Sequence, residues 1–532
     1  MSEQGLSPLQ EAEAQRLHPL SALFVAGGML RKVALPVLGG LVLGRGHQGW
    51  ELWATVPLCL IAMWSVLRTS RYRYQLKDGE LLVQEGVLGR EWRHIPLARI
   101  HTSNQRRQLL HRLLGVTELS LESAAGGKPE AVMRVLSLRA AVALEARLRH
   151  APAPDAVAPA ATETLASIGT ETAVAPAVGH SSSAPRTWLQ LGMGEIVRLG
   201  LASNRGMVIV GVLFGAVMQK DQLREPFLRA MRVPLVWLKQ TSAGLLAQGH
   251  WGWWLLEAGV LLLVGLLVLN LLSIVLALFK YHGFHLEQQG EKLVQRRGLS
   301  TRVSASARLP RLQRWEMQQN LRHRLMGRCR LAVTVAGDGD QHEHGLAPGG
   351  RFEELAPIAT PAEAQQMLQR CLPALDWAAL QWRPLGTKTL WRQLWGQGRW
   401  LALILGAGVM INVALHWALP AIGLAGVALL AVLALFAYAR AWTAFAAVAE
   451  QGELLLYRHG VLNRQWVLIA GPRLQHVALY SSALDRSLGL THLRADTLGG
   501  SRQHRALDIP CLDLAAAQWL RERLWRQILR PY

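Results

Sequence analysis

Cysteine, acidic residues, phenylalanine and tyrosine are all scarce in this chain. Its 532 residues include only 4 cysteines, and no two of them have the CxxC spacing of a zinc or redox site. Cys59 lies inside an apolar run, and the others are Cys329, Cys371 and Cys511. We therefore expect neither a disulfide framework nor a cysteine-based metal centre, and a reducing compartment fits this use of cysteine.

The short motifs of common enzymes are missing from the sequence as well. There is no GxSxG, no HExxH, no GxxxxGK[ST] loop, and no GxGxxG between a strand and a helix. The 36 acidic residues are scattered rather than paired for acid–base chemistry. His342 and His344 could bind a metal with Asp338 or Asp340, but the surrounding glycine and proline indicate an exposed loop. We predict no enzyme, no catalytic residue, no metal site and no cofactor.

Long apolar runs dominate the rest of the sequence. Hydrophobic residues account for 51% of the chain, and the charged residues concentrate between the runs. A transmembrane helix needs about 20 apolar residues, a length that 258–279 clearly reaches. The shorter runs 33–44 and 206–218 would, taken alone, indicate re-entrant or buried segments. Six spans are predicted, at 33–44, 51–67, 206–218, 258–279, 400–415 and 421–439.

Basic residues flank these runs mostly on one side. The chain has 57 Lys and Arg, and its net charge is +21. Cationic flanks mark the cytoplasmic side of a membrane protein, so both termini and all soluble domains are predicted in the cytoplasm. Glu11 and Glu13 near the start predict no cleavable signal peptide. The excess charge could also attract nucleic acid, but no binding helix or stacking platform accompanies it, so we predict no nucleic-acid partner.

One stretch, 78–122, occurs three times. Five residues of the first copy recur at constant offsets of 212 and 374 positions: Gly86, Arg90, Arg99, Arg112 and Gly115 become Gly298, Arg302, Arg311, Arg324 and Gly327, and then Gly460, Arg464, Arg473, Arg486 and Gly489. Identities at one offset in both copies indicate a threefold internal repeat. Each copy follows a basic segment and two apolar runs, so one unit consists of two spans and then a soluble domain.

The predicted domain organisation follows from this repeat. The Ala/Pro/Ser/Thr-rich stretch 151–187 cannot bury a core and is predicted to be a flexible linker, whereas the shorter junction at 373–388 should couple units two and three more rigidly. The predicted parts are an N-terminal tail 1–19; an interfacial helix and span pair 20–67; a soluble domain 68–150; the linker 151–187; an interfacial segment and span pair 188–280 with an external insertion 219–250; a soluble domain 281–374; an interfacial segment and span pair 375–443; and a soluble domain 444–532.

Within each soluble domain the pattern predicts short antiparallel strands and then one helix. Three segments of the first copy alternate apolar and polar residues between glycine or proline, namely Glu80–Gln84, Arg90–Ile95 and Glu118–Glu122. Thr360 and Glu363, with Pro361 between them, form a capping-box signature before a C-terminal helix of the second copy. Gly86, Gly115 and their equivalents are predicted in turns with positive φ.

The repeat also carries a family resemblance. Its residues are Gly79-Glu80-Leu81-Leu82, Gly86-Val87-Leu88, Ile95-Pro96-Leu97-Ala98-Arg99-Ile100 and Arg112-Leu113-Leu114-Gly115, matched in the third copy by Gly452-Glu453-Leu454-Leu455, Gly460-Val461-Leu462 and Ser487-Leu488-Gly489. They resemble the bacterial pleckstrin-homology (PH) family of membrane proteins, of the YdbS/YdbT type. Copy two departs most, with Lys292 in its first strand and Ala307-Arg308-Leu309-Pro310 in place of Ile95-Pro96-Leu97-Ala98.

The resemblance implies a fold class as well. The expected fold combines membrane α-helical spans with α+β, mostly-β soluble domains. It consists of three repeats, each with two transmembrane helices followed by a PH-like β-sandwich or barrel with a C-terminal helix. The family also places the chain in the inner membrane of a bacterial cell.

The repeated arginines are the candidate binding residues. They recur while their neighbours change, and a cation near anionic lipid gains on the order of 1 kcal/mol. The alternative is that some of them pair with acids inside the fold, such as Arg99 with Glu122 or Arg473 with Asp496. The predicted basic face consists of Arg90, Arg99, Arg112, Arg302, Arg311, Arg324, Arg464, Arg473 and Arg486.

Together these features predict a polytopic membrane scaffold. Its three cytoplasmic PH-like domains would bind partner proteins or anionic lipid headgroups and help to maintain the cell envelope, and a smaller membrane PH-domain protein is a candidate partner. Two alternatives stay open: a transporter or lipid-moving protein that uses the six spans, and a purely structural partner of the smaller PH protein. The apolar runs lack the intramembrane acid–base chain that transport usually needs.

Overall fold

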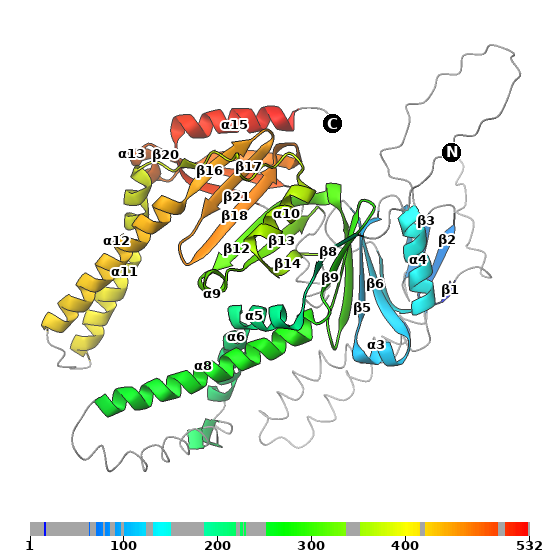
Figure 1. Ribbon diagram of the computed structural model, residues 1–532, viewed down its shortest axis with the longest axis horizontal. Coiled ribbons are helices and arrows are strands. Elements are labelled where there is room, and N and C mark those ends of the chain that lie inside the picture. Colours follow the sequence, from blue (N-terminus) through cyan, green and yellow to red (C-terminus); the bar gives the residue numbers. More distant parts are fainter. Residues whose placement is uncertain are drawn as a thin grey trace, which may run out of the picture.

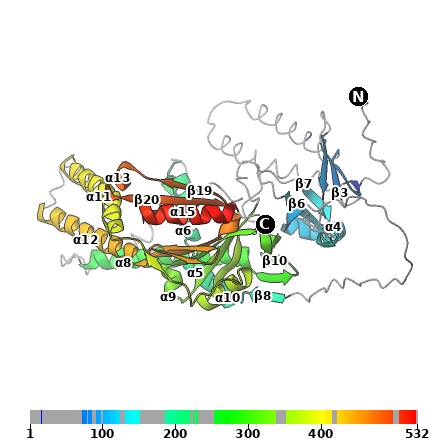
Figure 2. The same ribbon diagram turned by 90° about the horizontal axis from the view of Figure 1, so that it is seen from above.

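The computed structural model contains three sheet-rich domains and several long helices (Figure 1). In both views the helices α8 (Gly252–Tyr281), α11 (Lys388–Ala414) and α12 (Ala421–Phe445) extend to one side of the second and third domains (Figures 1 and 2). The structure describes residues 15–16, 63, 67, 71–77, 80–85, 91–96, 100–123, 131–150, 186–219, 224–226, 228–229, 252–336, 352–414, 421–497 and 506–529.

The second domain shows how one unit is built. Two antiparallel sheets follow each other along the chain, and a helix ends the domain. A strand from the linker side, β8 (Arg186–Gln190), lies at the outer edge of the first sheet. The other elements are β9 (His285–Gln289), β10 (Lys292–Arg297), β11 (Arg302–Arg308), β12 (Leu312–Asn320), the short helix α9 (Leu321–Leu325), β13 (Cys329–Val335), β14 (Glu354–Ala359) and α10 (Pro361–Cys371).

The first and third domains repeat this order of elements. The first domain contains β1 (Gln15–Arg16), β2 (Arg73–Lys77), β3 (Glu80–Glu85), β4 (Glu91–Pro96), β5 (Ile100–Arg107), α3 (Leu109–Leu113), β6 (Val116–Ser123), β7 (Ala131–Ser137) and α4 (Leu138–His150). The third contains β15 (Arg383–Pro384), β16 (Ala447–Gln451), β17 (Leu454–His459), β18 (Asn463–Ala470), β19 (Leu474–Tyr480), α13 (Ala483–Leu488), β20 (Leu490–Thr497), β21 (Ala506–Asp513) and α15 (Leu514–Ile528).

Local sequence signals account for these elements. Strands β3, β4 and β6 confirm the three strands predicted in the first copy, and in β13 every second residue is buried, as a two-residue period requires. Helix α10 begins at the predicted capping box, where the Thr360 hydroxyl accepts from the Glu363 amide at 3.3 Å and the Glu363 carboxylate accepts from the Thr360 amide at 2.8 Å. Gly115 and four of its predicted companions have positive φ, while Gly86 lies outside the described residues.

Strand pairing continues from each domain into the next. In the first junction β5 of domain one pairs with β11 of domain two, which places Arg107 opposite Arg302. In the second, β12 of domain two pairs with β18 of domain three, which places Gln319 opposite Arg464. Position 319 is position 107 plus the repeat offset, and 464 is the repeat equivalent of 302, so both junctions have the same register. Two seven-stranded sheets result, β7-β6-β5-β11-β10-β9-β8 and β14-β13-β12-β18-β17-β16-β15.

The second junction has a shared hydrophobic core in addition to the strand pairing. The cluster that contains fully buried Trp315 of β12 also contains Leu456 and Leu468 of the third domain. The cluster of domain one, which includes Leu81, Leu119 and Met133, is separate within the described residues. These contacts agree with the prediction that units two and three are coupled more rigidly.

The apolar helices support the predicted membrane anchor only in part. Two described helices are long and apolar enough to cross a membrane, at Leu262–Tyr281 and Gly423–Phe445. Helix α6 (Arg205–Met218) has 14 residues and therefore spans about 21 Å, less than the ~30 Å hydrocarbon layer. The predicted runs 33–44 and most of 51–67 lie outside the described residues, as do 20–32 and most of the insertion 219–250. The six-span layout therefore stays a prediction.

Close backbone approach holds the helices of the second unit together. A Cβ at Gly200, in the short helix α5 (Met193–Ala202), would lie 2.5 Å from the Ile274 Cα of α8. At Gly206 of α6, a Cβ would lie 2.4 Å from the Leu269 carbonyl oxygen, and the Gly206 amide donates to the Ser273 hydroxyl at 2.9 Å. Only glycine allows these contacts, so α5 and α6 are fixed against α8, and α5 also contacts β14 of the second domain.

Candidate functional site

The repeated arginine of the short helix lies at each domain junction. Arg112 of α3 donates from Nη1 to the Leu299 carbonyl oxygen of domain two at 3.0 Å, and Arg324 of α9 donates to the Val461 carbonyl oxygen of domain three at 3.1 Å. Leu299 and Val461 are equivalent positions of the hairpin between the second and third strands. The same side chain therefore makes the same interdomain hydrogen bond twice.

Two further arginines of the predicted face contact a neighbouring domain or helix. Arg473 of domain three donates from Nη1 to the Leu312 carbonyl oxygen of domain two, and its guanidinium lies 5.0 Å from the centroid of the Trp315 ring. Arg464 lies 4.4 Å from the centroid of the Phe445 ring at the end of α12. Burial, and then the nearby charge of Arg324, lower the pKa of Arg464.

The remaining predicted arginines are placed differently. Arg302 is exposed at the start of β11 in the first junction, and the Arg311 carbonyl oxygen accepts from the Ala336 amide at 2.8 Å. Arg486 of α13 is exposed and donates to Ser481 of its own domain at 3.3 Å. Arg90 and Arg99 lie outside the described residues, as do His342 and His344. Lipid contact by these arginines stays a prediction, although Arg112, Arg324 and Arg473 each make a domain-to-domain contact.

A glycine shapes the hairpin that accepts these arginines. Gly460 has φ +100°, and a Cβ at this position would lie 1.9 Å from the Asn463 carbonyl oxygen. Gly298 has the same role in the first junction, with φ +107° and the Thr301 carbonyl oxygen at 2.0 Å from a built Cβ. Each glycine thus allows the tight turn that carries the accepting carbonyl of the next residue, Leu299 or Val461.

We expect Gly460→Ala to destabilise the second junction by about 1–3 kcal/mol, since the alanine would need a strained backbone and a shifted hairpin. Thermal unfolding of the purified full-length chain in detergent measures this effect. Gly426→Ala in α12 is the matched control, because its Cβ meets nothing within 4 Å. Equal melting temperatures for the two variants would show that the hairpin does not need this backbone conformation.

Arg324→Ala is expected to cost about 1 kcal/mol, because an exposed interdomain hydrogen bond to Val461 is lost. The same unfolding measurement applies. Arg521→Ala in α15 removes an equal charge from an exposed position away from both junctions and should change stability by less than about 0.5 kcal/mol. If Arg324→Ala and Arg521→Ala have the same melting temperature, Arg324 does not stabilise the junction.

A buried carboxylate, Glu354, joins the second domain to its membrane helix. Glu354 is 1% exposed and accepts from Arg297 at 3.1 Å, from Arg330 at 2.5 Å and from the Tyr281 hydroxyl at 2.9 Å. Arg205 at the start of α6 donates to the same Tyr281 hydroxyl at 3.1 Å. Two strands and the ends of two helices therefore meet at one carboxylate.

Charge decides the protonation state of Glu354. Burial alone would raise the pKa of its carboxyl, but the nearby charges of Arg330, Lys280 and Arg297 outweigh burial and lower the pKa to about 2. The carboxylate is therefore ionised at neutral pH. Without this carboxylate, Arg297 and Arg330 would each keep a charge with no opposite charge beside it. The ionised Glu354 therefore stabilises the arrangement of both arginines.

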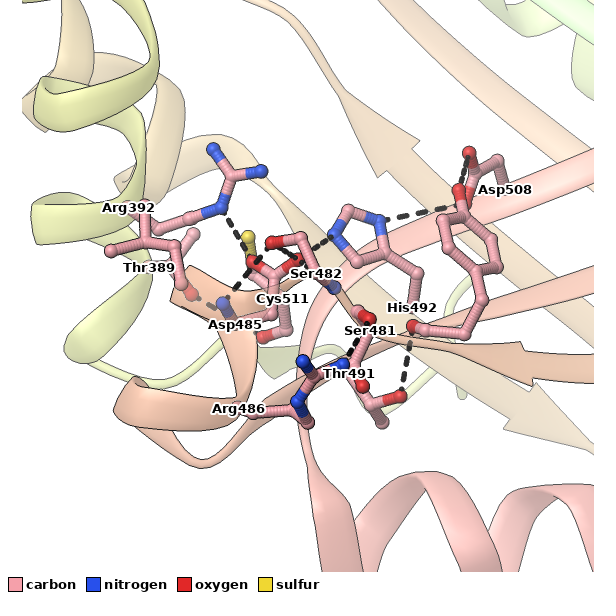
Figure 3. A network of polar contacts seen from close by, with 12 residues as sticks. Thr389, Arg392, Ser481, Ser482, Asp485, Arg486, Thr491, His492, Asp508 and Cys511 are labelled. Atoms are coloured by element: carbon pink, nitrogen blue, oxygen red, sulfur yellow. Dashed lines mark hydrogen bonds and ion pairs between the residues drawn. The ribbon is translucent and has the colours of Figure 1, made fainter.

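A second buried carboxylate, Asp485, joins the third domain to α11 (Figure 3). Asp485 is 1% exposed and accepts from the Arg392 guanidinium of α11, and His492 Nε2 lies 3.3 Å from its Oδ2. Ser482 completes a reciprocal capping box with Asp485, with amide-to-side-chain distances of 3.0 and 3.2 Å. Beyond His492 the network continues to Asp508, whose Oδ1 lies 3.8 Å from His492 Nδ1.

Burial would raise the pKa of Asp485, but hydrogen bonds from Ser482 and Arg392 outweigh it and lower the pKa to about 2. Tyr480 donates to Asp508, and the Tyr480 ring stacks on His492 with centroids 4.8 Å apart. The group as a whole is a chain of polar contacts from α11 through α13 to the strands β20 and β21. It couples the domain to the helix.

The position of Asp485 differs among the three repeats. Its equivalents are His111 and His323, both buried, and burial followed by nearby arginines lowers the pKa of each, for His323 to about 4. In the second unit the carboxylate lies on the helix instead, where Glu195 of α5 accepts from Arg328 of the domain at 2.8 and 3.0 Å. An ion pair thus joins the domain to a helix in both units, with the carboxylate on the helix in one and on the domain in the other.

Sequence reasoning missed these two carboxylates. Comparison of the repeats favours residues that recur, whereas Asp485 is replaced by His111 and His323 in the other copies. The Ser482-x-x-Asp485 spacing is a capping signature that could have marked Asp485. Glu354 has no comparable local signal, because its partners come from three separate stretches of chain. Among the described residues no group of three or more His, Cys, Asp or Glu could hold a metal ion.

Comparison with known proteins agrees with this repeated architecture. A family model described as "Bacterial PH domain" matches residues 22–152, 233–365 and 401–528. The chain is 22% identical over 378 residues to the UPF0699 transmembrane protein YdbT of Bacillus subtilis (strain 168), which covers 68% of this chain and 70% of the relative. No solved structure matches. The three matched stretches include most of the chain, which therefore belongs to the bacterial PH domain family as a membrane protein with three such domains.

Proposed function

We propose that the chain is a membrane-anchored scaffold whose three PH domains act as one sheet-linked array on the cytoplasmic side, and that it contacts anionic lipid headgroups. The observation that carries this proposal is the repeated junction. Both junctions have the same strand register and the same arginine-to-carbonyl hydrogen bond. Domains joined in this way present a fixed surface, which suits a scaffold that positions partners.

The contacts between the domains and their helices support a fixed distance of the domains from the membrane. Glu354 ties the second domain to α8 and Asp485 ties the third to α11. The first turns of α11 expose three tryptophans, Trp391, Trp395 and Trp400, and Arg399 lies 5.7 Å from the Trp400 ring centroid. Tryptophan is typical of the membrane–water interface, and each cation near anionic lipid gains on the order of 1 kcal/mol. We place the headgroup contact at this belt of α11.

Lipid binding by the full-length chain tests the proposal. The protein is reconstituted singly in nanodiscs with either phosphatidylcholine alone or added phosphatidylglycerol, and its melting temperature is compared. Anionic lipid is expected to raise the melting temperature, and Arg399→Gln should reduce that rise. Arg521→Gln in α15 is the matched control and should leave it unchanged. Equal melting temperatures in the two lipids would contradict headgroup binding.

Two predictions about function stay open beside this proposal. A smaller membrane PH-domain protein stays a predicted partner, and transport through the helices stays an untested alternative. Substrate flux into proteoliposomes that contain the chain would favour transport over a scaffold.

A further inference from the structure

Each junction pairs two kinds of strand edge, one from the earlier domain and one from the later domain. In a chain of three domains, one edge of each kind is not used by a junction. In the first junction β5 of domain one pairs with β11 of domain two. In the second junction β12 of domain two pairs with β18 of domain three. The corresponding edges left over are β4 of domain one and β19 of domain three. Within the part of the chain that the structure describes, β4 pairs only with β3, and β19 pairs only with β20.

We infer that β4 of one chain pairs with β19 of a second copy of the same chain, which extends the array through a third junction of the same kind. This rests on the proposed scaffold role and names its partner. Free strand edges readily pair with another strand, and a head-to-tail contact between unlike edges joins copies in series. The two junctions inside the chain pair the same kinds of edge, so the strand that fits each unused edge is the corresponding strand of a second copy.

The repeat fixes the register of the inferred pair. Transferring the register of both internal junctions by the repeat offsets places Glu91 opposite Tyr480, Trp92 opposite Leu479, Arg93 opposite Ala478 and His94 opposite Val477. The register position of Trp92 opposite Leu479 corresponds to that of Trp466 opposite Met317 in the second junction. None of these four pairs sets like charges against each other.

Irregularity in β19 does not prevent this pairing. Its ladder with β20 shifts register between Leu474 and His476. The equivalent shifts occur in β5, between Ile100 and Thr102, and in β12, between Leu312 and Arg314. Both of those strands nevertheless pair with the following domain through their other edge, so a shift in this ladder does not prevent a junction.

Arg486 is the third member of the junction arginines. Arg112 and Arg324 reach the next domain, whereas Arg486, which has no following domain in the chain, is exposed and bonds to Ser481 beside it. In the inferred junction its guanidinium would instead donate to the second copy, as the guanidinium groups of Arg112 and Arg324 donate to the next domain. The recurrence of this arginine in the last copy is thereby explained.

The apolar helices restrict the direction in which copies add. The second and third units each have their own long apolar helix, α8 and α12, beside the domain. Helices that cross one membrane keep their units at the same level relative to it. Copies therefore join side by side in the plane of the membrane rather than stacking away from it.

Disulfide crosslinking between two differently tagged full-length chains tests the inference. One chain carries Arg93→Cys and the other Ala478→Cys, and both are co-expressed and oxidised mildly in membranes. Opposed residues on paired strands are close enough for a disulfide. The expected product carries both tags and forms at least fivefold more than with the control pair Arg93→Cys and His476→Cys, which is two residues out of register on the same face.

The mass of the unmodified chain in detergent provides a second measurement that needs no substitution. The account predicts a species of at least twice the 58.7 kDa chain mass, and about a fivefold weaker association for Arg486→Ala. A single-copy mass at every concentration, with crosslinking no greater than the control, overturns the inference. A crosslink from Arg93→Cys to a smaller membrane protein rather than to the second chain also overturns it. The lipid test uses single copies, so either test can fail without the other.

Discussion

Replacing Glu354 by glutamine is expected to lower the free energy of unfolding by about 3–5 kcal/mol, the largest effect of any single substitution considered. The reason is that Arg297, whose side chain is 2% exposed, loses the carboxylate 3.1 Å away, and Arg330 loses the same partner. Glutamine keeps the size of the side chain, so the loss reports charge rather than packing. Tryptophan fluorescence follows the unfolding, because Trp315 is fully buried in the same domain.

A fall in melting temperature on the order of 10 °C is expected for Glu354→Gln. Glu522→Gln is the control, since Glu522 is 62% exposed and lies 4.0 Å from Arg526 across one helical turn. That exposed pair should contribute less than about 0.5 kcal/mol. If the two variants melt at the same temperature, the buried network does not stabilise the domain.

The contribution of Glu354 to stability should also depend on pH. The pKa of Glu354 is lowered to about 2, below the ~4.3 of an unfolded chain, so its stabilising effect is complete above pH ~4.3 and is lost as the pH falls through about 2. The unsubstituted protein should therefore lose more stability than Glu354→Gln between pH 4 and pH 2. Parallel losses in the two proteins would contradict this origin of the acid sensitivity.

Replacing Asp485 by asparagine is expected to cost about 2–3 kcal/mol. Asparagine can still cap α13 together with Ser482, but it removes the charge that faces Arg392 and His492. Arg392 is 26% exposed, and water therefore compensates part of its loss, which makes this effect smaller than that at Glu354. Thermal unfolding of the full-length chain measures it.

Asp485→Ala separates the cap from the ion pair. It loses the reciprocal hydrogen bond to Ser482 as well, and should cost about 1 kcal/mol more than asparagine. If Asp485→Asn is neutral and only the alanine variant is destabilised, Asp485 serves as a helix cap and does not hold the domain to α11.

Much of the single domain could be predicted from the sequence. Period-two alternation gave β3, β4 and β6, the Thr360–Glu363 capping box gave the start of α10, and repeated glycines gave turns with positive φ. These signals are local, because each depends on residues a few positions apart. The family resemblance added the expectation of a PH-like fold, and the family model confirmed the family itself.

The joining of domains could not be predicted in the same way. Ser103 and Ser306 are opposed in the first junction although 203 residues separate them, and no local pattern specifies such a pairing. The recurring arginines were the available signal, yet a basic residue beside a membrane predicts lipid contact as readily as a hydrogen bond to a neighbouring domain. Arg473 shows the difference, since it reaches Leu312 and Trp315 of domain two.

The apolar helices could be predicted from the sequence only in part. Hydropathy identified α8 and α12, each long and apolar enough to cross. It also marked 206–218, where α6 is too short to cross by length alone, and 400–415, which is the end of the longer helix α11 that begins at Lys388 and is not one of the two apolar helices. Hydropathy counts apolar residues but does not register that the first turns of α11 pair with Asp485.

Amide hydrogen exchange of the full-length chain in detergent tests the central claim, that the three domains are joined strand to strand. In an isolated domain β11 and β18 would be edge strands, and every second amide would face water. The account predicts that peptides covering Ser304–Ser306 and Gln465–Leu468 exchange as slowly as the central strand β10, because those amides bond to β5 and β12. Exchange of half of these amides within seconds would show independent domains and contradict the account.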